Sequence, residues 1–141
     1  MAAVLDIAGK PSLGKRRRVV LPIVNSIDAA VIATDLEGKV VFWNSVAEKL
    51  YGWSWQEAVG RRITDLVVPP NGQPDAAKIM KRLQDGKSWT GEFKLRRRDG
   101  TDFLATVTDE PMQDNDGNLV GIIGISRPKE SRRPANDKRS A

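Results

Sequence analysis

The strongest constraint in this sequence is a change in the hydrophobic period at Gly86. Before this residue, apolar side chains recur every three or four positions, which predicts an amphipathic helix from Pro74 to about Asp85. After it, residues of high β propensity alternate, and Asp-Gly pairs mark tight turns between them. We therefore expect one long helix followed by three antiparallel strands, at Trp89–Arg97, Asp102–Asp109 and Leu119–Ile125.

The first half of the chain predicts a hairpin and several short helices. Ala30–Asp35 and Lys39–Trp43 are rich in strand-forming residues and are separated by a Glu-Gly turn. Ser45 and Ser54 each precede a glutamate by three positions, which is the signature of a capping box at a helix start. We expect these two helices to end at Gly52 and Gly60, and a short helical or irregular piece to span Ile63–Val68.

The segregation of strands from helices along the chain indicates an α+β fold. The predicted architecture is a five-stranded antiparallel sheet with short helices packed on one face. Its last strand, Leu119–Ile125, is apolar on both faces and should therefore lie in the centre of the sheet.

The chain of 141 residues contains no cysteine and no histidine. Its length suits one domain with one hydrophobic core. The missing residue types exclude disulfides, cysteine nucleophiles and His-ligated zinc or haem within this chain. No run approaches the roughly 20 apolar residues of a membrane span, and the first residues lack the order of a secretory signal. We therefore expect a cytoplasmic protein.

The net charge of +5 is distributed unevenly. Residues 1–20 carry five basic side chains against Asp6, and residues 127–141 carry six against Glu130 and Asp137. The part between them has 15 acidic and 12 basic residues. The chain is therefore expected to consist of a disordered basic segment (1–18), a folded domain (19–127) and a basic tail or linker (128–141).

No catalytic residues are evident in the sequence. Asp109 and Glu110 come closest to a carboxylate pair, but adjacent strand residues point to opposite faces and cannot flank one bond. No glycine-rich phosphate loop follows a strand, and no serine or lysine has an evident activating base. The prediction is a domain that is not an enzyme and has no metal site.

From about Ile23 to Arg127, the sequence resembles the PAS family of sensory domains. The resemblance rests on an ordered set of motifs rather than on one match. These motifs are Asp35-Leu-Glu-Gly38, Val41-Phe-Trp-Asn44, Ala47-Glu-Lys-Leu-Tyr-Gly-Trp53 with Glu57 and Gly60, Trp89-Thr-Gly-Glu92, Arg98-Asp-Gly-Thr101, and Asp116-Gly117 through Gly121-Ile-Ile-Gly-Ile-Ser-Arg127.

The resemblance implies helices that enclose a small cavity against one face of the sheet. Members of the family bind a small ligand or cofactor there, or nothing. They commonly dimerise through the sheet and the N-terminal helix, and they relay a change to an output domain. One departure concerns that relay: many members continue from the position of Arg127 with Asp-Ile-Thr, whereas this chain continues with Pro128-Lys-Glu. The coupling element after the last strand is therefore altered.

The resemblance leaves the cofactor of this chain open. Members that form a cysteinyl flavin adduct or a thioester-linked chromophore need a cysteine, and oxygen-sensing haem members typically need a histidine. Both residue types are absent, so cysteinyl-adduct flavin and His-ligated haem are disfavoured. A flavin held without a covalent bond and a lipid-like small molecule remain as candidates.

The implied cavity gives a set of candidate ligand-binding residues. Asn44 has a competing role as a helix cap, and Ile79 and Met80 have a competing role in ordinary core packing. The candidate set comprises Phe42, Asn44, Leu50, Tyr51, Ile63, Ile79, Met80, Leu83 and Ile123.

A homodimer is expected because both faces of the strand that ends at Trp43 are apolar. Val41 and Trp43 share one parity, so the face opposite the core needs cover from another element or a second subunit. Further apolar residues before Asp28 recur at helical spacing, which predicts a short helix over 20–27. The candidate dimerisation residues are Val20, Ile23, Val24, Ile27, Val41 and Trp43, and cover by the N-terminal helix alone is the alternative.

The favoured hypothesis is a signal-sensing and homodimerisation module. It would bind a small apolar ligand in its cavity and relay the change to an output domain outside this chain. The alternative is a ligand-free protein–protein interaction domain. A second alternative is a nucleic-acid-associated protein that acts through its basic tails.

Overall fold

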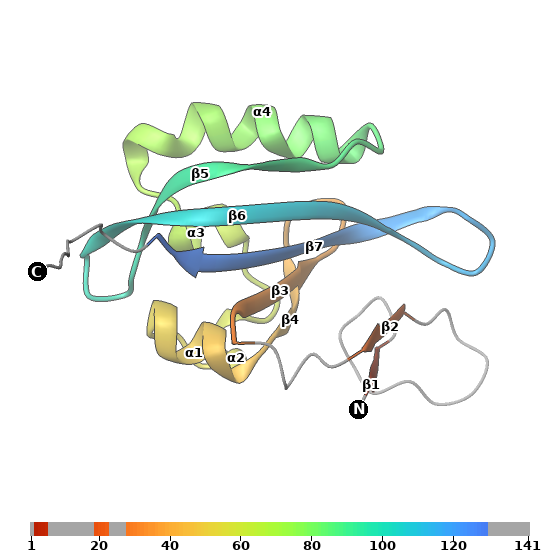
Figure 1. Cartoon of the computed structure of the whole chain (residues 1–141), viewed down its shortest axis with the longest axis horizontal. Helices are drawn as coiled ribbons and strands as arrows, with labels where there is room; N and C mark the ends of the chain where they lie inside the picture. Colours follow the sequence, from red (N-terminus) through yellow and green to blue (C-terminus); the bar gives the residue numbers. More distant parts are fainter. Residues whose placement is uncertain (1, 6–18, 23–27, 130–141) are drawn as a thin grey trace, which may run out of the picture.

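The computed structural model describes residues 2–5, 19–22 and 28–129. Its main feature is a five-stranded antiparallel sheet with the strand order β4-β3-β7-β6-β5 (Figure 1). The strands are β3 (Ala30–Thr34), β4 (Val40–Trp43), β5 (Trp89–Arg96), β6 (Asp102–Gln113) and β7 (Leu119–Pro128). The predicted fold class is confirmed, and β7 lies in the centre, as its two apolar faces predicted.

Short helices connect the first two strands to the last three. They are α1 (Ser45–Tyr51), α2 (Trp55–Ala58), α3 (Ile63–Val67), a 3₁₀ turn (Pro70–Gly72) and α4 (Gln73–Gln84). Figure 1 shows α4 along β5, and α1 and α2 near β3 and β4. The main hydrophobic core lies between these helices and the inner face of the sheet, and it includes Ala30, Ile32, Val40, Trp43, Ala47, Tyr51, Leu66, Leu95 and Ala105.

Two further strands lie near the N-terminus. β1 (Ala2–Leu5) pairs antiparallel with β2 (Val19–Pro22). The structure thus differs from the predicted disordered segment at residues 2–5, and from the predicted helix over 20–27 at residues 20–22. Val19, Val20 and Leu21 form a short run that satisfies strand propensity as well as helical spacing, and periodicity cannot separate the two over so few residues.

Several predictions concern residues outside the described ranges. They are the rest of the segment 1–18, the remainder of the predicted N-terminal helix with Ile23, Val24 and Ile27, and the tail from residue 130 onwards. No helix within residues 28–129 is long and apolar enough to cross a membrane.

A β-bulge in β4 changes which of its residues face the helices. Ile32 pairs with Trp43, whereas Thr34 pairs with Val40, so one extra residue of β4 fits between these two pairs. Val40 and Trp43 therefore both belong to the main core. Val41 and Phe42 belong instead to a second apolar cluster, with Ala33, Met112, Val120 and Ile123.

The prediction that Trp43 contacts a second subunit is therefore wrong. Its side chain is only 4% exposed, and its Nε1–H donates to the carbonyl of Trp53 at 2.9 Å. Val41 is also buried within the chain, at 9% exposure. Strict alternation put these two residues on one face, and the bulge breaks that alternation.

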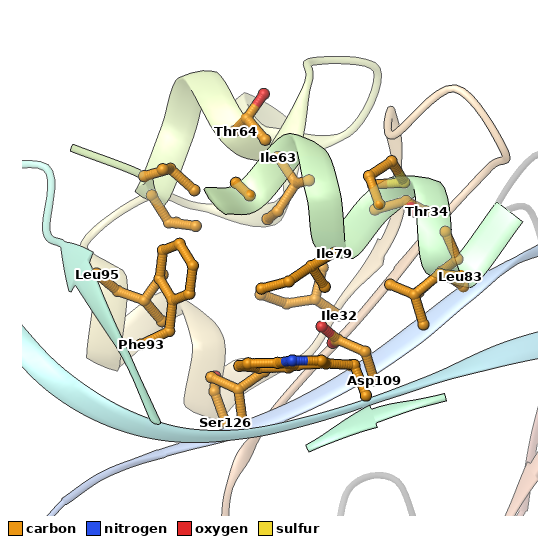
Figure 2. A pocket seen from close by; sticks show the side chains of 18 of the residues that line it. Ile32, Thr34, Ile63, Thr64, Ile79, Leu83, Phe93, Leu95, Asp109 and Ser126 are labelled. Carbon is orange, nitrogen blue, oxygen red and sulfur yellow. The ribbon is translucent and has the colours of Figure 1, made fainter. Parts of the chain in front are cut away.

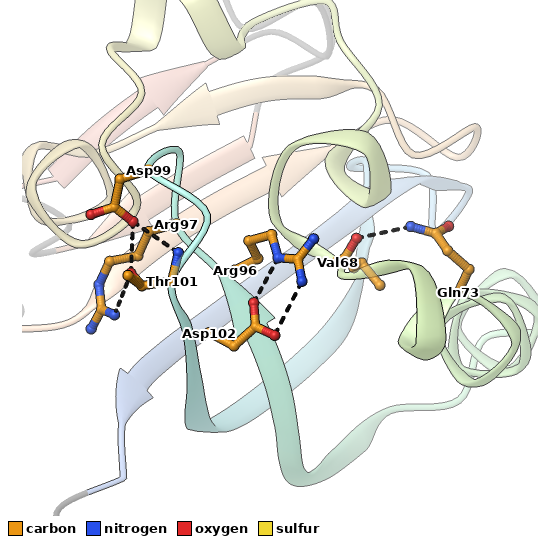
Figure 3. Close-up of polar contacts among 7 residues, drawn as sticks. All are labelled: Val68, Gln73, Arg96, Arg97, Asp99, Thr101 and Asp102. Carbon is orange, nitrogen blue, oxygen red and sulfur yellow. Dashed lines mark hydrogen bonds and ion pairs between the residues drawn. The ribbon is translucent and has the colours of Figure 1, made fainter.

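Gln73 fixes the start of α4 above the sheet. Its Nε2 donates to the carbonyls of Thr64 and Val68, both at 3.0 Å (Figure 3 shows the contact with Val68). At the C-terminal end of β5, Arg96 forms an ion pair with Asp102. In the turn that follows, Asp99 accepts hydrogen bonds from Thr101 (Figure 3). These contacts anchor α4 and the β5–β6 turn, and the apolar face of α4 becomes one wall of a cavity.

Candidate functional site

A cavity of about 120 Å³ lies between α3, α4 and the inner face of the sheet. Figure 2 shows Ile63 and Thr64 on one side of it, Phe93 and Leu95 on another, and Ile79 and Leu83 along α4. Its wall is mostly aliphatic and aromatic, because the apolar face of α4 packs opposite the inward residues of β3, β5 and β7. Such a wall favours an apolar ligand.

Five of the nine predicted ligand-binding residues line this cavity. They are Tyr51, Ile63, Ile79, Met80 and Leu83. All five lie in α1, α3 or α4, where the 3.6-residue period or the position after a loop indicated the inward face. Whether these residues bind a ligand remains a prediction.

The other four predicted residues lie elsewhere. Phe42 and Ile123 pack in the second apolar cluster, on the other face of the sheet. Leu50 packs at the edge of the main core without reaching the cavity. In β7 the inward residue is Ile122 rather than Ile123, and because this strand is apolar on both faces, the sequence pattern could not decide its parity.

Asn44 is a structural junction and not a ligand contact. Its Oδ1 accepts from the backbone N–H of Val31 at 3.0 Å and of Ala47 at 2.9 Å, and its Nδ2 donates to the carbonyl of Ala29 at 3.0 Å. The residue is 3% exposed. Asn44, and not Ser45, therefore caps α1, whereas the predicted capping box of Ser54 is confirmed in α2.

The cavity also contains polar side chains that the sequence analysis did not select. Asp109 on β6 is the most consequential of them, and Figure 2 shows its carboxyl in the cavity wall. The sequence does indicate that Asp109 points inward, because it has the same parity on β6 as Phe103, Ala105 and Val107, which all face the main core. Strand alternation therefore places the Asp109 side chain on the same face as this apolar series.

Gly124 on β7 provides the room for the Asp109 carboxyl. The two residues are opposite each other in the pairing of β6 and β7. A Cβ atom at Gly124 would lie far inside van der Waals contact with Asp109 Oδ1, so the carboxyl occupies the space that a side chain on β7 would take. Burial raises the pKa of Asp109 from its ordinary value of 3.8 to about 7.

Neither Asp109 nor Thr34 has a hydrogen-bond partner for its side chain within the described part of the chain. No donor among residues 28–129 reaches the carboxyl of Asp109. The hydroxyl of Thr34 on β3 is buried in the cavity wall and is also without a partner. A desolvated polar group without a partner costs free energy, so the buried Thr34 hydroxyl and the half-buried Asp109 carboxyl both favour an occupant that can hydrogen bond.

Tyr51 connects the helices to the last strand at the edge of the cavity. Its hydroxyl lies 2.7 Å from the Oγ of Ser126 on β7, and both residues line the cavity. Its ring also packs between Trp43 and Phe103, at centroid distances of 5.7 and 5.8 Å. Burial raises the pKa of the Tyr51 hydroxyl, which therefore stays neutral at physiological pH.

The sequence matches the PAS fold family over residues 21–129. The chain belongs to this family. A crystal structure of the PAS domain of a protein from Colwellia psychrerythraea is 27% identical, and superposes with a TM-score of 0.68 over 76% of this chain and 91% of that one.

A blue-light photoreceptor of Listeria monocytogenes serovar 1/2a is 30% identical to this PAS domain over 112 residues. The match covers 77% of this chain and 44% of the photoreceptor, so the chain spans less than half the length of this relative. A light-oxygen-voltage domain studied with a flavin analogue superposes with a TM-score of 0.67 at 21% identity, over 76% of this chain and 82% of that one. The second likeness concerns the fold alone.

The cavity residues of this PAS domain do not fit a flavin. Pockets for drug-sized ligands measure about 300–1,000 Å³, whereas this cavity measures about 120 Å³. No lysine or arginine lines it, so a flavin phosphate would have no counter-charge there. The chain has no cysteine for an adduct. Within residues 28–129 there is also no group of three or more acidic side chains that could hold a metal ion.

Proposed function

We propose that this PAS domain is a signal-sensing module whose cavity binds a small, mostly apolar molecule. The observation that carries the proposal is an apolar cavity that contains two side chains, Asp109 and Thr34, without hydrogen-bond partners. A ligand with an apolar body and a polar group would bury the walls and satisfy these side chains together.

The relay of the signal is expected to pass through β7. This strand contributes Ile122, Gly124 and Ser126 to the cavity, and it continues directly to Pro128. Ser126 in turn touches the Tyr51 hydroxyl of the helical layer. A ligand that favours one packing of these groups would shift the position or mobility of the end of β7, and a following output domain would receive that change.

The test is a pair of matched substitutions on α4. Ala76 lines the cavity, whereas its neighbour Ala77 is exposed. Ala76→Phe would fill the cavity, and Ala77→Phe adds the same ring in solvent. Native mass spectrometry of protein purified from cells should show a discrete added mass on the wild type and on Ala77→Phe, and none on Ala76→Phe.

Thermal unfolding supplies the quantitative part of this test. A ligand at 100 times its Kd stabilises the folded state by about 2.7 kcal/mol. The compound identified from the added mass should raise the Tm of the wild type and of Ala77→Phe, but not of Ala76→Phe. No added mass on the wild type, together with no stabilisation by candidate compounds, would favour the ligand-free interaction domain.

A further inference from the structure

We propose that the ligand of this cavity is a small apolar molecule with one basic nitrogen, which lies as an ammonium ion against the carboxylate of Asp109. This inference rests on the proposed function, because it names the chemical class of the sensed molecule. It follows from where Asp109 lies, from the charges around it and from the aromatic ring beside it.

The sheet holds the Asp109 carboxyl in the cavity wall. Trp89, Asp109, Gly124 and Ile32 form one row across β5, β6, β7 and β3. All four residues line the cavity, and the glycine leaves the space that the carboxyl occupies. The next residue, Glu110, is exposed on the opposite face, so the two adjacent carboxyls are in contrasting environments.

The surroundings of Asp109 supply no positive charge. The lining residues include no lysine or arginine, and the one other titratable group among them is the Tyr51 hydroxyl from α1. An ionised Asp109 is therefore a half-buried charge without a counter-ion, and its partial desolvation raises its pKa. A ligand ammonium would supply the missing charge and the missing hydrogen-bond donor in one group.

The aromatic side chains favour the same ligand. Trp89 is the cross-strand neighbour of Asp109, and its ring meets Phe93 edge-on at a centroid distance of 6.4 Å. Both rings line the cavity, and a cation near the face of an indole ring is attracted by its π electrons. The rest of the lining is mostly aliphatic, so the body of the ligand must be apolar.

The size of the cavity limits the ligand to about one ring. An engineered apolar cavity of about 150 Å³ accommodates benzene, and this cavity measures about 120 Å³. Benzylamine and benzyl alcohol are suitable probes, because they have the same number of non-hydrogen atoms and nearly the same shape. They differ in the positive charge that the amine carries at neutral pH.

Isothermal titration calorimetry of both probes at pH 8 tests the inference. The wild type should bind benzylamine at least tenfold more tightly than benzyl alcohol. Asp109→Asn should lose at least tenfold in affinity for the amine and little for the alcohol. Glu110→Gln is the matched control, because it removes a neighbouring carboxylate from the exposed face and should behave as the wild type.

The pH dependence gives a second readout. Benzylamine affinity of the wild type should rise between pH 5 and pH 8, because Asp109 loses its proton over this range. The affinity of Asp109→Asn for the amine should stay level over the same range. Circular dichroism and the Tm of each variant show whether it is folded.

Two outcomes would overturn the inference. The first leaves the proposed function standing, and the second overturns it as well. If benzyl alcohol binds as tightly as benzylamine and Asp109→Asn changes neither, the cavity is a binding site but not one for amines. If neither probe binds to the wild type and no added mass is present on the purified protein, both the inference and the proposed function fail.

Discussion

At the scale of single residues, the half-buried carboxyl of Asp109 makes stability depend on pH in an unusual direction. Its pKa is about 7 in the folded chain, against an ordinary value of 3.8. The folded state therefore keeps this proton at pH values where the unfolded state has lost it. The contribution of the protonated Asp109 to the free energy of unfolding is fully present below pH 3.8. It is lost as the pH rises through about 7.

We predict that Asp109→Asn becomes more stable relative to the wild type as the pH rises. A difference of about three pKa units corresponds to at most about 4 kcal/mol. Urea unfolding of both proteins at pH 4.5 and pH 8 measures this difference, and Glu110→Gln serves as the control. A difference that is the same at both pH values would show that Asp109 is not desolvated.

The hydroxyl of Thr34 gives a second prediction at this scale. It is buried and has no hydrogen-bond partner in the described part of the chain. Thr34→Val replaces this hydroxyl with a methyl group of similar size, so the ligand-free protein should gain about 1 kcal/mol in its free energy of unfolding. Thr106→Val, at an exposed position, is the control for the change in β propensity. A loss of stability in Thr34→Val would contradict the prediction.

The sequence was least informative about single residues on strands. The period of two predicts which residues share a face, but it cannot say which face is inward when both are apolar. Ile122 lines the cavity, whereas the sequence favoured Ile123. Phe42 was misplaced for another reason, because one extra residue in β4 reverses the parity after it.

At the scale of elements, the central strand β7 contains two glycines that face different neighbours. A Cβ atom at Gly121 would lie far inside contact with the carbonyl oxygen of Thr34, which belongs to the backbone of β3. At Gly124 the obstructing atom belongs to the side chain of Asp109, which can rotate away. The sheet therefore tolerates a side chain at one position better than at the other.

We predict that Gly121→Ala destabilises the fold more than Gly124→Ala does. Overpacking against fixed atoms costs about 1–3 kcal/mol, and Gly121→Ala should lie at the upper end. Gly124→Ala should cost less in stability but should displace the carboxyl of Asp109 and weaken binding of benzylamine. Urea unfolding and calorimetry measure the two effects. Equal losses of stability would contradict the predicted difference between backbone and side-chain contacts.

Most of the elements were predictable because their local signals agree with their packing. The helix α4 shows a clear apolar face before Gly86, and β5, β6 and β7 are separated by Asp-Gly turns. The cap of α1 stays open between Asn44 and Ser45 in the sequence, because both are good cap residues. Asn44 is selected as the cap by its hydrogen bonds with Val31 and Ala29, which lie at the start of the sheet. These partners are distant in the sequence, so a local sequence pattern does not show them.

At the scale of the whole molecule, the predicted homodimer still depends on an apolar surface. Of the proposed dimerisation residues, Val41 and Trp43 are buried within the chain. Leu104 on β6 is 42% exposed, and its parity places it on the face of the sheet opposite the main core. We therefore expect the outer face of the sheet near Leu104 to be part of any dimer contact.

We predict that the wild type sediments as a dimer and that Leu104→Lys shifts it towards monomer. Sedimentation velocity over a range of concentrations measures this equilibrium. Thr106→Lys introduces the same charge two residues away on the same face and indicates how far the contact extends. A wild type that sediments as a monomer at all concentrations would refute the homodimer.

The strand order also determines when the sheet can form. β3 and β4 make one hairpin, β5 and β6 make another, and these two hairpins are joined only through β7. A chain leaving the ribosome thus has two separate hairpins until its final strand emerges and pairs with Ala30–Thr34, some ninety residues earlier. Until that moment the edges of β3 and β6 that will pair with β7 are open, and open strand edges are templates for pairing with other chains.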